Sequence, residues 1–411
     1  MSRIVINSLG CKVNFADTET VAAGLGVEPG MPVEIIGTCC VTGEGEKQSR
    51  KEVRRALKRV GSGGTVFVTG CAARLAPASF AAAGKNVVVL TGAPEEAAAE
   101  IASAFPSQAV AGTVRKRERV TAGRSRCFLK VQDGCANMCS YCVVPLVRGR
   151  PRSLPLEQLT LAAADRVAEG YSELVVSGID VGAWQGGDEK LPGLLERLSR
   201  IDGLLRLRLS SIEAAGVTPE LLDVMAKNSN IGRHLHIPLQ SGDDGVLRSM
   251  GRRYDLALFS QKIVAVREAL PEVNLTTDAI VGYPAEDERA FGNTLDFIAA
   301  AGFSKVHVFS YSPRPGTRAA ALGDPVPSPE KKRRSRLLRE LSDRLGEEHR
   351  QRKVGGVSEI LLESQVEPGV CAGYSSDYTH FYVEGGGDQA LLRVRAETVI
   401  RNGIRGKISN A

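Results

Sequence analysis

The chain has 411 residues, of which 43% are hydrophobic and 24% charged, with 9 cysteines and a formal net charge of +6. At roughly 100–200 residues per domain, this length predicts two to four domains, and the composition excludes a globally disordered chain or a disulfide-stapled miniprotein. No apolar run approaches the roughly 18 residues that span a bilayer, and the first residues enter a strand pattern without a signal-peptide layout. We therefore expect a cytoplasmic protein with reduced thiols and no membrane partner.

Positive charge is concentrated in two connecting segments. Residues 113–152 carry ten basic and two acidic side chains, and residues 330–353 carry ten and five. The body between them, residues 153–329, carries 17 basic and 23 acidic side chains, and residues 354–411 carry five and seven. This distribution favours the binding of a polyanion at the connecting segments, although solvated helix and loop faces would give the same pattern.

Strand and helix signals alternate along residues 1–112. Short runs rich in Val and Ile predict strands at residues 3–8, 33–38, 65–70 and 86–91, with helical stretches at 17–26, 44–60 and 95–104. Such alternation predicts a parallel sheet with helices on its faces. Sites in sheets of this kind form beyond the carboxyl ends of the strands.

A cysteine follows each of the first three predicted strands, namely Cys11, Cys39 beside Cys40, and Cys71. Parallel strands bring these ends to one edge of the sheet, so three thiols that are distant in sequence converge there. We favour a shared metal site in this amino-terminal domain over the alternative of ordinary buried cysteines.

A basic linker, residues 113–125, leads into a longer α/β region, residues 126–353. Six strand patterns alternate with helices there: strands at 127–132, 173–177, 204–210, 234–239, 274–281 and 305–310, and helices at 156–169, 191–200, 219–227, 256–269 and 287–301. Six units predict a partial (βα)6 barrel, because a complete eightfold barrel needs about 250 residues. Residues 329–353 predict one basic helix, and residues 354–411 a small β-barrel.

The first strand of this region is followed by a loop with the spacing C-x3-C-x2-C, formed by Cys135, Cys139 and Cys142, with Tyr141 before the last cysteine. Three thiolates on one loop suit three irons of a cubane and leave the fourth iron without a protein ligand. The alternative, structural zinc, needs four ligands, and no histidine lies near this loop.

The cysteine loop resembles the signature of the radical S-adenosylmethionine enzymes. In that superfamily the methionyl group of S-adenosylmethionine chelates the free iron of a [4Fe-4S] cluster, and electron transfer yields a 5′-deoxyadenosyl radical. The segments around Cys11, Thr38-Cys39-Cys40 and Gly70-Cys71 are similar to the amino-terminal motifs of the methylthiotransferases. The resemblance implies a second [4Fe-4S] cluster held by Cys11, Cys39 and Cys71. Gly37 departs from the Asn usual before Thr38, which leaves Cys40 as an alternative ligand.

Within the methylthiotransferases, residues 130–135 and 143–149 are most similar to the branch that modifies N6-threonylcarbamoyladenosine at position 37 of tRNA. The carboxy-terminal segment resembles the RNA-binding barrel called TRAM. The resemblance implies that one S-adenosylmethionine methylates a sulfur and a second activates C2 of the base. It also implies the tRNA anticodon loop, an electron donor and a sulfur donor as partners, and we expect a monomer.

Polar or small residues at the predicted strand ends are further candidates, because barrel enzymes place their sites there. The superfamily resemblance implies cofactor contacts from Tyr141, Gly178, Asp180, Ser210, Glu213, Gln240, Asp278 and Gly282. No residue is assigned a catalytic role. We interpret His234 and His236 as packed side chains, and Cys127 and Cys371 as structural residues.

Two other substrates stay open. One is an aspartate of a ribosomal protein, which the acidic balance of residues 354–411 would favour, and the other is N6-isopentenyladenosine 37. The threonylcarbamoyl group carries a carboxylate, which an apolar pocket would leave without a partner. We predict that Arg148, Arg206 or Arg208 binds this carboxylate, and that the run Lys331-Lys332-Arg333-Arg334 contacts RNA phosphates.

Overall fold

The amino-terminal sheet consists of four parallel strands in the order β1-β2-β3-β4. The computed structural model describes residues 4–25, 31–105, 126–385, 390–400 and 402–409, so the predicted linker 113–125 lies outside it. The strands are β1 (Ile4–Ser8), β2 (Val33–Thr38), β3 (Thr65–Gly70) and β4 (Val87–Val89), and the helices are α1 (Lys12–Ala22), α2 (Gly43–Val60), α3 (Cys71–Leu75), α4 (Pro77–Ala81) and α5 (Pro94–Ala104).

Helix α1 begins five residues before the helix predicted at 17–26. Its start is set by Cys11, whose Sγ accepts a hydrogen bond from the Asn14 amide at 3.4 Å and so caps the helix. Cysteine is not among the residues that usually signal a helix start, so the sequence pattern placed the boundary too late. The consequence is that Cys11 and Lys12 lie at the carboxyl end of β1, where the helix leaves the sheet.

The central region forms the partial barrel that the sequence predicts. Its strands make two parallel three-stranded sheets, β11-β8-β5 and β12-β13-β14, joined by the isolated bridges Leu207↔Ile231 and Ser211↔His236. The strands are β5 (Arg126–Lys130), β8 (Glu173–Ser177), β11 (Arg206–Leu209), β12 (His234–His236), β13 (Asn274–Val281) and β14 (Lys305–Ser310). The helices are α7 (Leu156–Ala168), α8 (Leu191–Ser199), α9 (Pro219–Lys227), α10 (Asp244–Met250), α11 (Leu256–Ala269) and α12 (Glu288–Ala301).

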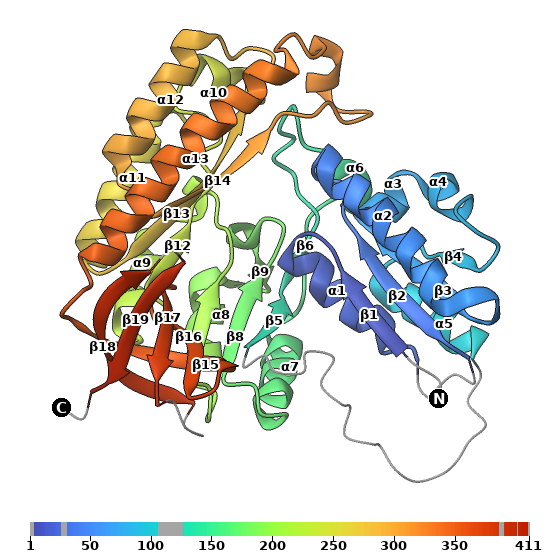
Figure 1. Ribbon diagram of the computed structural model, residues 1–411, viewed down its shortest axis with the longest axis horizontal. Helices are drawn as coiled ribbons and strands as arrows, with labels where there is room; N and C mark the ends of the chain where they lie inside the picture. Colours follow the sequence, from blue (N-terminus) through green and yellow to red (C-terminus); the bar gives the residue numbers. More distant parts are fainter. Residues whose placement is uncertain (1–3, 26–30, 106–125, 386–389, 401, 410–411) are drawn as a thin grey trace.

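The carboxy-terminal segment closes into a five-stranded barrel in the order β15-β16-β17-β19-β18. Its strands are β15 (Val357–Glu367), β16 (Val370–Ser375), β17 (His380–Glu384), β18 (Leu391–Ile400) and β19 (Gly403–Ile408). The last strand, β19, closes the barrel. Short strand patterns at 357–363, 369–374, 380–383 and 391–396 predict the other four strands, and no pattern marks residues 403–408 as a fifth. Figure 1 shows this barrel and the sheet β1–β4 on opposite sides of the partial barrel, which lies between them.

The predicted basic helix is observed as α13 (Ser328–Gln351), which packs along β14 and α12. Its basic run is mostly not available to RNA, because Lys331 and Arg334 are buried and form ion pairs with Asp324 and Glu286. The prediction that the whole run contacts phosphates is therefore wrong. Among the described residues, no helix combines the length and apolar character needed to cross a membrane.

Candidate active site

The cysteine loop, residues 134–142, is held in a tight turn after β6 (Gln132–Asp133). Gly134 has a φ of +72°, and a Cβ at this position would meet the Arg150 carbonyl oxygen at 2.1 Å. Only glycine fits there, so the turn sets the direction in which the loop leaves the strand. The thiols of Cys135, Cys139 and Cys142 all line one cavity.

This cavity has a volume of about 1010 Å³ and is bounded by all three parts of the chain. Cys11 and Lys12 reach it from the amino-terminal sheet, and Tyr374, Tyr378 and Tyr382 reach it from the carboxy-terminal barrel. The ends of the central strands supply the rest of the wall. The volume is at the upper end of the range for ligand pockets, which suits a cofactor together with a large substrate group.

Seven of the eight predicted cofactor contacts line this cavity: Tyr141, Gly178, Asp180, Ser210, Glu213, Gln240 and Asp278. The eighth, Gly282, lies behind it, where its amide donates to Glu286 Oε1 at 2.7 Å. Gly282 has a φ of +73°, and a Cβ there would approach Lys331 Cγ to 2.5 Å. A glycine is needed here because the backbone of Gly282 packs closely against α13.

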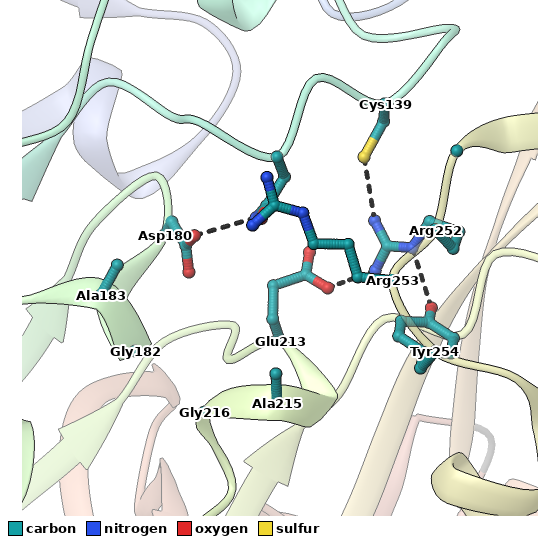
Figure 2. A pocket seen from close by; sticks show the side chains of 12 residues that line it. Cys139, Asp180, Gly182, Ala183, Glu213, Ala215, Gly216, Arg252, Arg253 and Tyr254 are labelled. Carbon is teal, nitrogen blue, oxygen red and sulfur yellow. Dashed lines mark hydrogen bonds and ion pairs between the residues drawn. The ribbon is translucent and has the colours of Figure 1, made fainter.

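Next to the cysteine loop, a smaller recess of about 240 Å³ is built around Arg252 (Figure 2). Arg252 forms an ion pair with Glu213, donates to Cys139 Sγ at 3.3 Å and donates to the Tyr254 hydroxyl at 3.0 Å. Burial raises the pKa of the Glu213 carboxyl, and the charge of Arg252 opposes this. The arrangement connects a predicted cofactor contact with a cysteine of the loop.

On the opposite side of this recess, Asp180 accepts a hydrogen bond from Asn137 Nδ2 at 2.9 Å, and its amide donates to Gln132 Oε1 at 2.8 Å. Burial raises the pKa of Asp180 as well. Neither Arg252 nor Asn137 was a predicted site residue. Arg252 follows α10 far along the chain, and no local pattern marks it, whereas Asn137 lies inside the cysteine loop and could have been considered on that ground.

Cys11, Cys39 and Cys71 lie together at the carboxyl ends of β1, β2 and β3, as predicted from the alternation. Gly10, with a φ of +102°, passes so close to Cys39 that an added Cβ would lie 2.8 Å from its Sγ. Burial raises the pKa of Cys39 to about 11, and the nearby Cys11 and Cys71 thiols add to the rise.

The neighbouring Cys40 has a different environment. It is fully buried in an apolar cluster with Val53, Val68 and Phe80, between the sheet and the helices on one face. Cys40 also hydrogen-bonds to Cys71, which raises the pKa of Cys40. Cys71 belongs to the same cluster, whereas Cys39 lies outside it, against the Gly10 turn that precedes Cys11. This contact favours Cys39 as the thiol directed toward Cys11, while both neighbours lie near Cys71.

Arg148 joins the two cysteine groups. Its Nη1 donates to Asp17 Oδ2 at 2.8 Å and to Asp133 Oδ1 at 2.9 Å, and its Nε donates to Cys71 Sγ at 3.1 Å. Lys130 adds a further ion pair to Asp17. The Arg148 side chain is 1% exposed and does not line the cavity, so the prediction that it binds a substrate carboxylate is wrong.

Arg206 and Arg208 were predicted for the same role, but both hold the carboxy-terminal barrel in place. Arg206 Nη1 donates to the Tyr374 carbonyl at 2.7 Å, and Arg208 donates to the carbonyls of Ser376 at 2.9 Å and Ser375 at 2.7 Å. Both side chains are buried, and neither lines the cavity. That prediction is also wrong.

A row of aromatic rings crosses the cavity wall. His234 stacks on Tyr378 at a centroid distance of 5.1 Å, Tyr378 on Tyr374 at 5.0 Å, and the row continues through His380 to Tyr382 with spacings of 4.7 Å. The second predicted packed histidine, His236, lies 2.9 Å from Thr276 Oγ1 and 3.1 Å from Asp278. Both histidines therefore have polar or aromatic partners in the wall.

The donor sets fit iron–sulfur clusters better than single ions. Within the described part of the chain, no three His, Cys, Asp or Glu side chains converge closely enough to hold one metal ion. Because a cubane offers each cysteine its own iron, its thiolates stand farther apart than the ligands of one ion. Arg148 Nη2 is buried with no hydrogen-bond acceptor among the described residues, and sulfurs of a cluster beside Cys71 would provide one.

The sequence matches two family models. One is the Radical SAM superfamily, over residues 129–298, and the other is the Uncharacterized protein family UPF0004, over residues 3–92. Among solved structures, the fold is similar to the radical S-adenosylmethionine methyltransferase TsrM from Kitasatospora setae. That match has a TM-score of 0.55 at 15% identity and covers 90% of this chain and 81% of TsrM.

Relatives are similar over almost the whole length. The chain is 36% identical to "Threonylcarbamoyladenosine tRNA methylthiotransferase MtaB" of Bacillus subtilis, covering 94% of this chain and 91% of that protein, and 33% identical to its Thermotoga maritima namesake, covering 98% and 96%. It is 31% identical to "tRNA-2-methylthio-N(6)-dimethylallyladenosine synthase" of Sphingopyxis alaskensis, covering 87% and 86%. With these relatives and the cysteine loop in a partial barrel, the chain belongs to the radical S-adenosylmethionine methylthiotransferase family.

Proposed function

We propose that this protein inserts a methylthio group at C2 of N6-threonylcarbamoyladenosine at position 37 of tRNA. The observation that carries the proposal is the shared cavity, into which the cysteine loop, Cys11 and the aromatic row of the carboxy-terminal barrel all open. The relatives from Bacillus and Thermotoga, whose names specify this nucleoside, support the choice of substrate.

Each group of cysteines has a separate role in this proposal. Cys135, Cys139 and Cys142 would hold one [4Fe-4S] cluster, and Cys11, Cys39 and Cys71 the second. Together with S-adenosylmethionine, a cluster in the loop supplies the radical chemistry that an unactivated aromatic C–H requires. An electron donor and a sulfur donor would be needed as partners.

The protein's own side chains would position the reactants. Asp180 and Glu213, held by Asn137 and Arg252, face the side of the cavity next to the cysteine loop and suit the polar groups of S-adenosylmethionine. Partial burial raises the pKa values of both carboxyls.

The aromatic row suits RNA. A base in the anticodon loop must leave its stack to expose C2, and single-stranded bases bind proteins by stacking on aromatic rings. The row from His234 to Tyr382 gives such a platform beside the cavity, and Arg126 lies 4.6 Å over the Tyr374 ring. An extruded base and its neighbours would find stacking partners along it.

Nucleoside mass spectrometry of total tRNA from a deletion strain tests the proposal. We expect loss of 2-methylthio-N6-threonylcarbamoyladenosine and accumulation of the form that lacks the methylthio group. The intact gene should restore the modification, and a Cys135→Ala version should not. Loss of only the isopentenyl-type methylthio nucleoside would move the protein to the sister branch. Unchanged tRNA nucleosides with loss of methylthio-aspartate from a ribosomal protein would refute the RNA substrate.

A further inference from the structure

Lys12 is a cation in the cavity wall that has no acidic partner among the described residues. It is the first residue of α1, directly after Cys11, and its side chain lines the large cavity. Its Nζ lies 6.0 Å from the centroid of the Tyr378 ring, a member of the aromatic row. Within the described part of the chain, no Asp or Glu forms an ion pair with it. An ammonium group placed this way is available to an anion that enters the cavity.

The other cations of this wall are engaged or differently placed. Arg252 pairs with Glu213, and Lys305 pairs with Asp343 at 3.2 Å. Arg350 also lines the cavity without an acidic partner among the described residues, but it extends from the last turn of α13. Of these cations, only Lys12 is next to one of the cysteines 11, 39 and 71. In the proposed function, these cysteines hold the second cluster, beside which the methylthio sulfur is transferred.

We infer that Lys12 binds the carboxylate of the N6-threonylcarbamoyl group and so selects adenosines with an acidic N6 substituent. This inference rests on the proposed function and deepens it. The urea linkage places the threonine nitrogen beside N1 of adenine, so the carboxylate extends along the same edge of the base that carries C2. A base with C2 toward Cys11 therefore turns its carboxylate toward the neighbouring residue, Lys12.

Lys12 also accounts for discrimination between substrates. An isopentenyl group has no charge to offer, so it would leave the ammonium in the cavity without a partner when it displaces water. The threonylcarbamoyl group supplies a carboxylate, and a charge-assisted hydrogen bond of this kind changes affinity by about 10- to 100-fold. Tyr378 lies beside the same ammonium, with its ring packed against His234, Tyr374 and Arg208.

The test compares two anticodon stem-loops on the anaerobically prepared, cluster-loaded protein. One carries N6-threonylcarbamoyladenosine, and the other carries the same nucleoside with its carboxylate replaced by a carboxamide. The dissociation constants are measured by fluorescence anisotropy. We expect wild type to prefer the carboxylate by about 10- to 100-fold, Lys12→Gln and Lys12→Met to lose that preference, and Lys12→Arg to regain most of it.

Arg350→Gln is the matched control, because it removes from the same cavity another cation that has no ion pair within the described ranges. It should weaken both stem-loops equally and keep their ratio. Iron content and circular dichroism verify that each variant is folded and loaded. A carboxylate preference that survives in both neutral Lys12 variants would overturn the inference, as would the absence of a preference in wild type.

Mass spectrometry of the same stem-loops after turnover separates this inference from the proposed function. If wild type methylthiolates the threonylcarbamoyl stem-loop but Lys12→Gln keeps the preference, only the role of Lys12 fails. If wild type methylthiolates an isopentenyl stem-loop and leaves the threonylcarbamoyl stem-loop unmodified, the proposed function itself fails.

Discussion

Replacing Arg208 by Met should loosen the carboxy-terminal barrel from the rest of the protein. The side chain is buried, donates to the Ser375 and Ser376 carbonyls and places Nε 3.0 Å from Glu173 Oε2. Met removes these contacts and leaves Glu173, itself buried, with Arg126 at 3.7 Å as its remaining ion pair. Removing one partner of a buried ion pair costs about 3–5 kcal/mol. Because Arg126 still pairs with Glu173, we expect a cost of about 3 kcal/mol, at the lower end of this range.

Hydrogen exchange measures this cost locally. If the barrel opens as a unit, about 3 kcal/mol corresponds to exchange more than about 100-fold faster in peptides from the turn between β16 and β17. Peptides from the sheet β1–β4 should keep their rates. Arg200→Met is the matched control, because Arg200 is 70% exposed and its ion pair with Glu196 is worth about 1 kcal/mol or less. Equal exchange in wild type and Arg208→Met would refute the docking role.

Further predictions concern the two clusters and Asp377, which lies in the turn between β16 and β17. Changing the loop cysteines 135, 139 and 142 to Ala should remove one cluster and abolish 5′-deoxyadenosine formation. Changing cysteines 11, 39 and 71 should remove the other cluster and spare cleavage, measured by iron content and chromatography. Cys40→Ser should keep the second cluster, whereas Cys39→Ser should lose it; the reverse pattern would exchange their roles. Burial would raise the pKa of Asp377, but His349 and Lys353 hold it well below its usual value. Its contribution is therefore complete above about pH 4 and is lost as the pH falls further. Asp377→Asn should lower stability at pH 7 by about 1–3 kcal/mol and flatten the acid limb of a denaturation profile.

The elements with a strong period were predictable from the sequence. The strands of the first sheet and the five predicted helices of the central region lie within a few residues of their predicted bounds, because buried strands and amphipathic helices show their periods locally. The seven-residue helix α10 was not predicted. The exceptions have local causes. Helix α1 starts early because a cysteine caps it. Strand β19 is short and contains two glycines, so it forms a strand only through its pairing with β17 and β18 in the closed barrel.

The site was predictable where topology alone determines it. Strand ends of a parallel sheet meet at one edge, which is why Cys11, Cys39 and Cys71 could be assigned to one edge of the sheet. The cofactor contacts followed from the superfamily resemblance, and seven of the eight line the cavity. The partners of the arginines were not predictable in this way. Arg148 and Arg208 reach their partners across domain boundaries. No local sequence pattern shows which cations will form ion pairs and which will not.

The basic helix shows why charge counts misjudge a binding surface. Residues 330–353 carry a net positive charge, but Arg333 and Arg334 pair with Glu288, Glu286 and Glu330, so much of that charge neutralises the acidic central body. A charge that is already paired releases no counterions when RNA binds and adds little to its salt dependence. Of the four-residue run, only Lys332 is exposed. In the proposed function, recognition of the nucleoside would then rest on the cavity, with stacking from the aromatic row and a charge from Lys12, which has no acidic partner among the described residues.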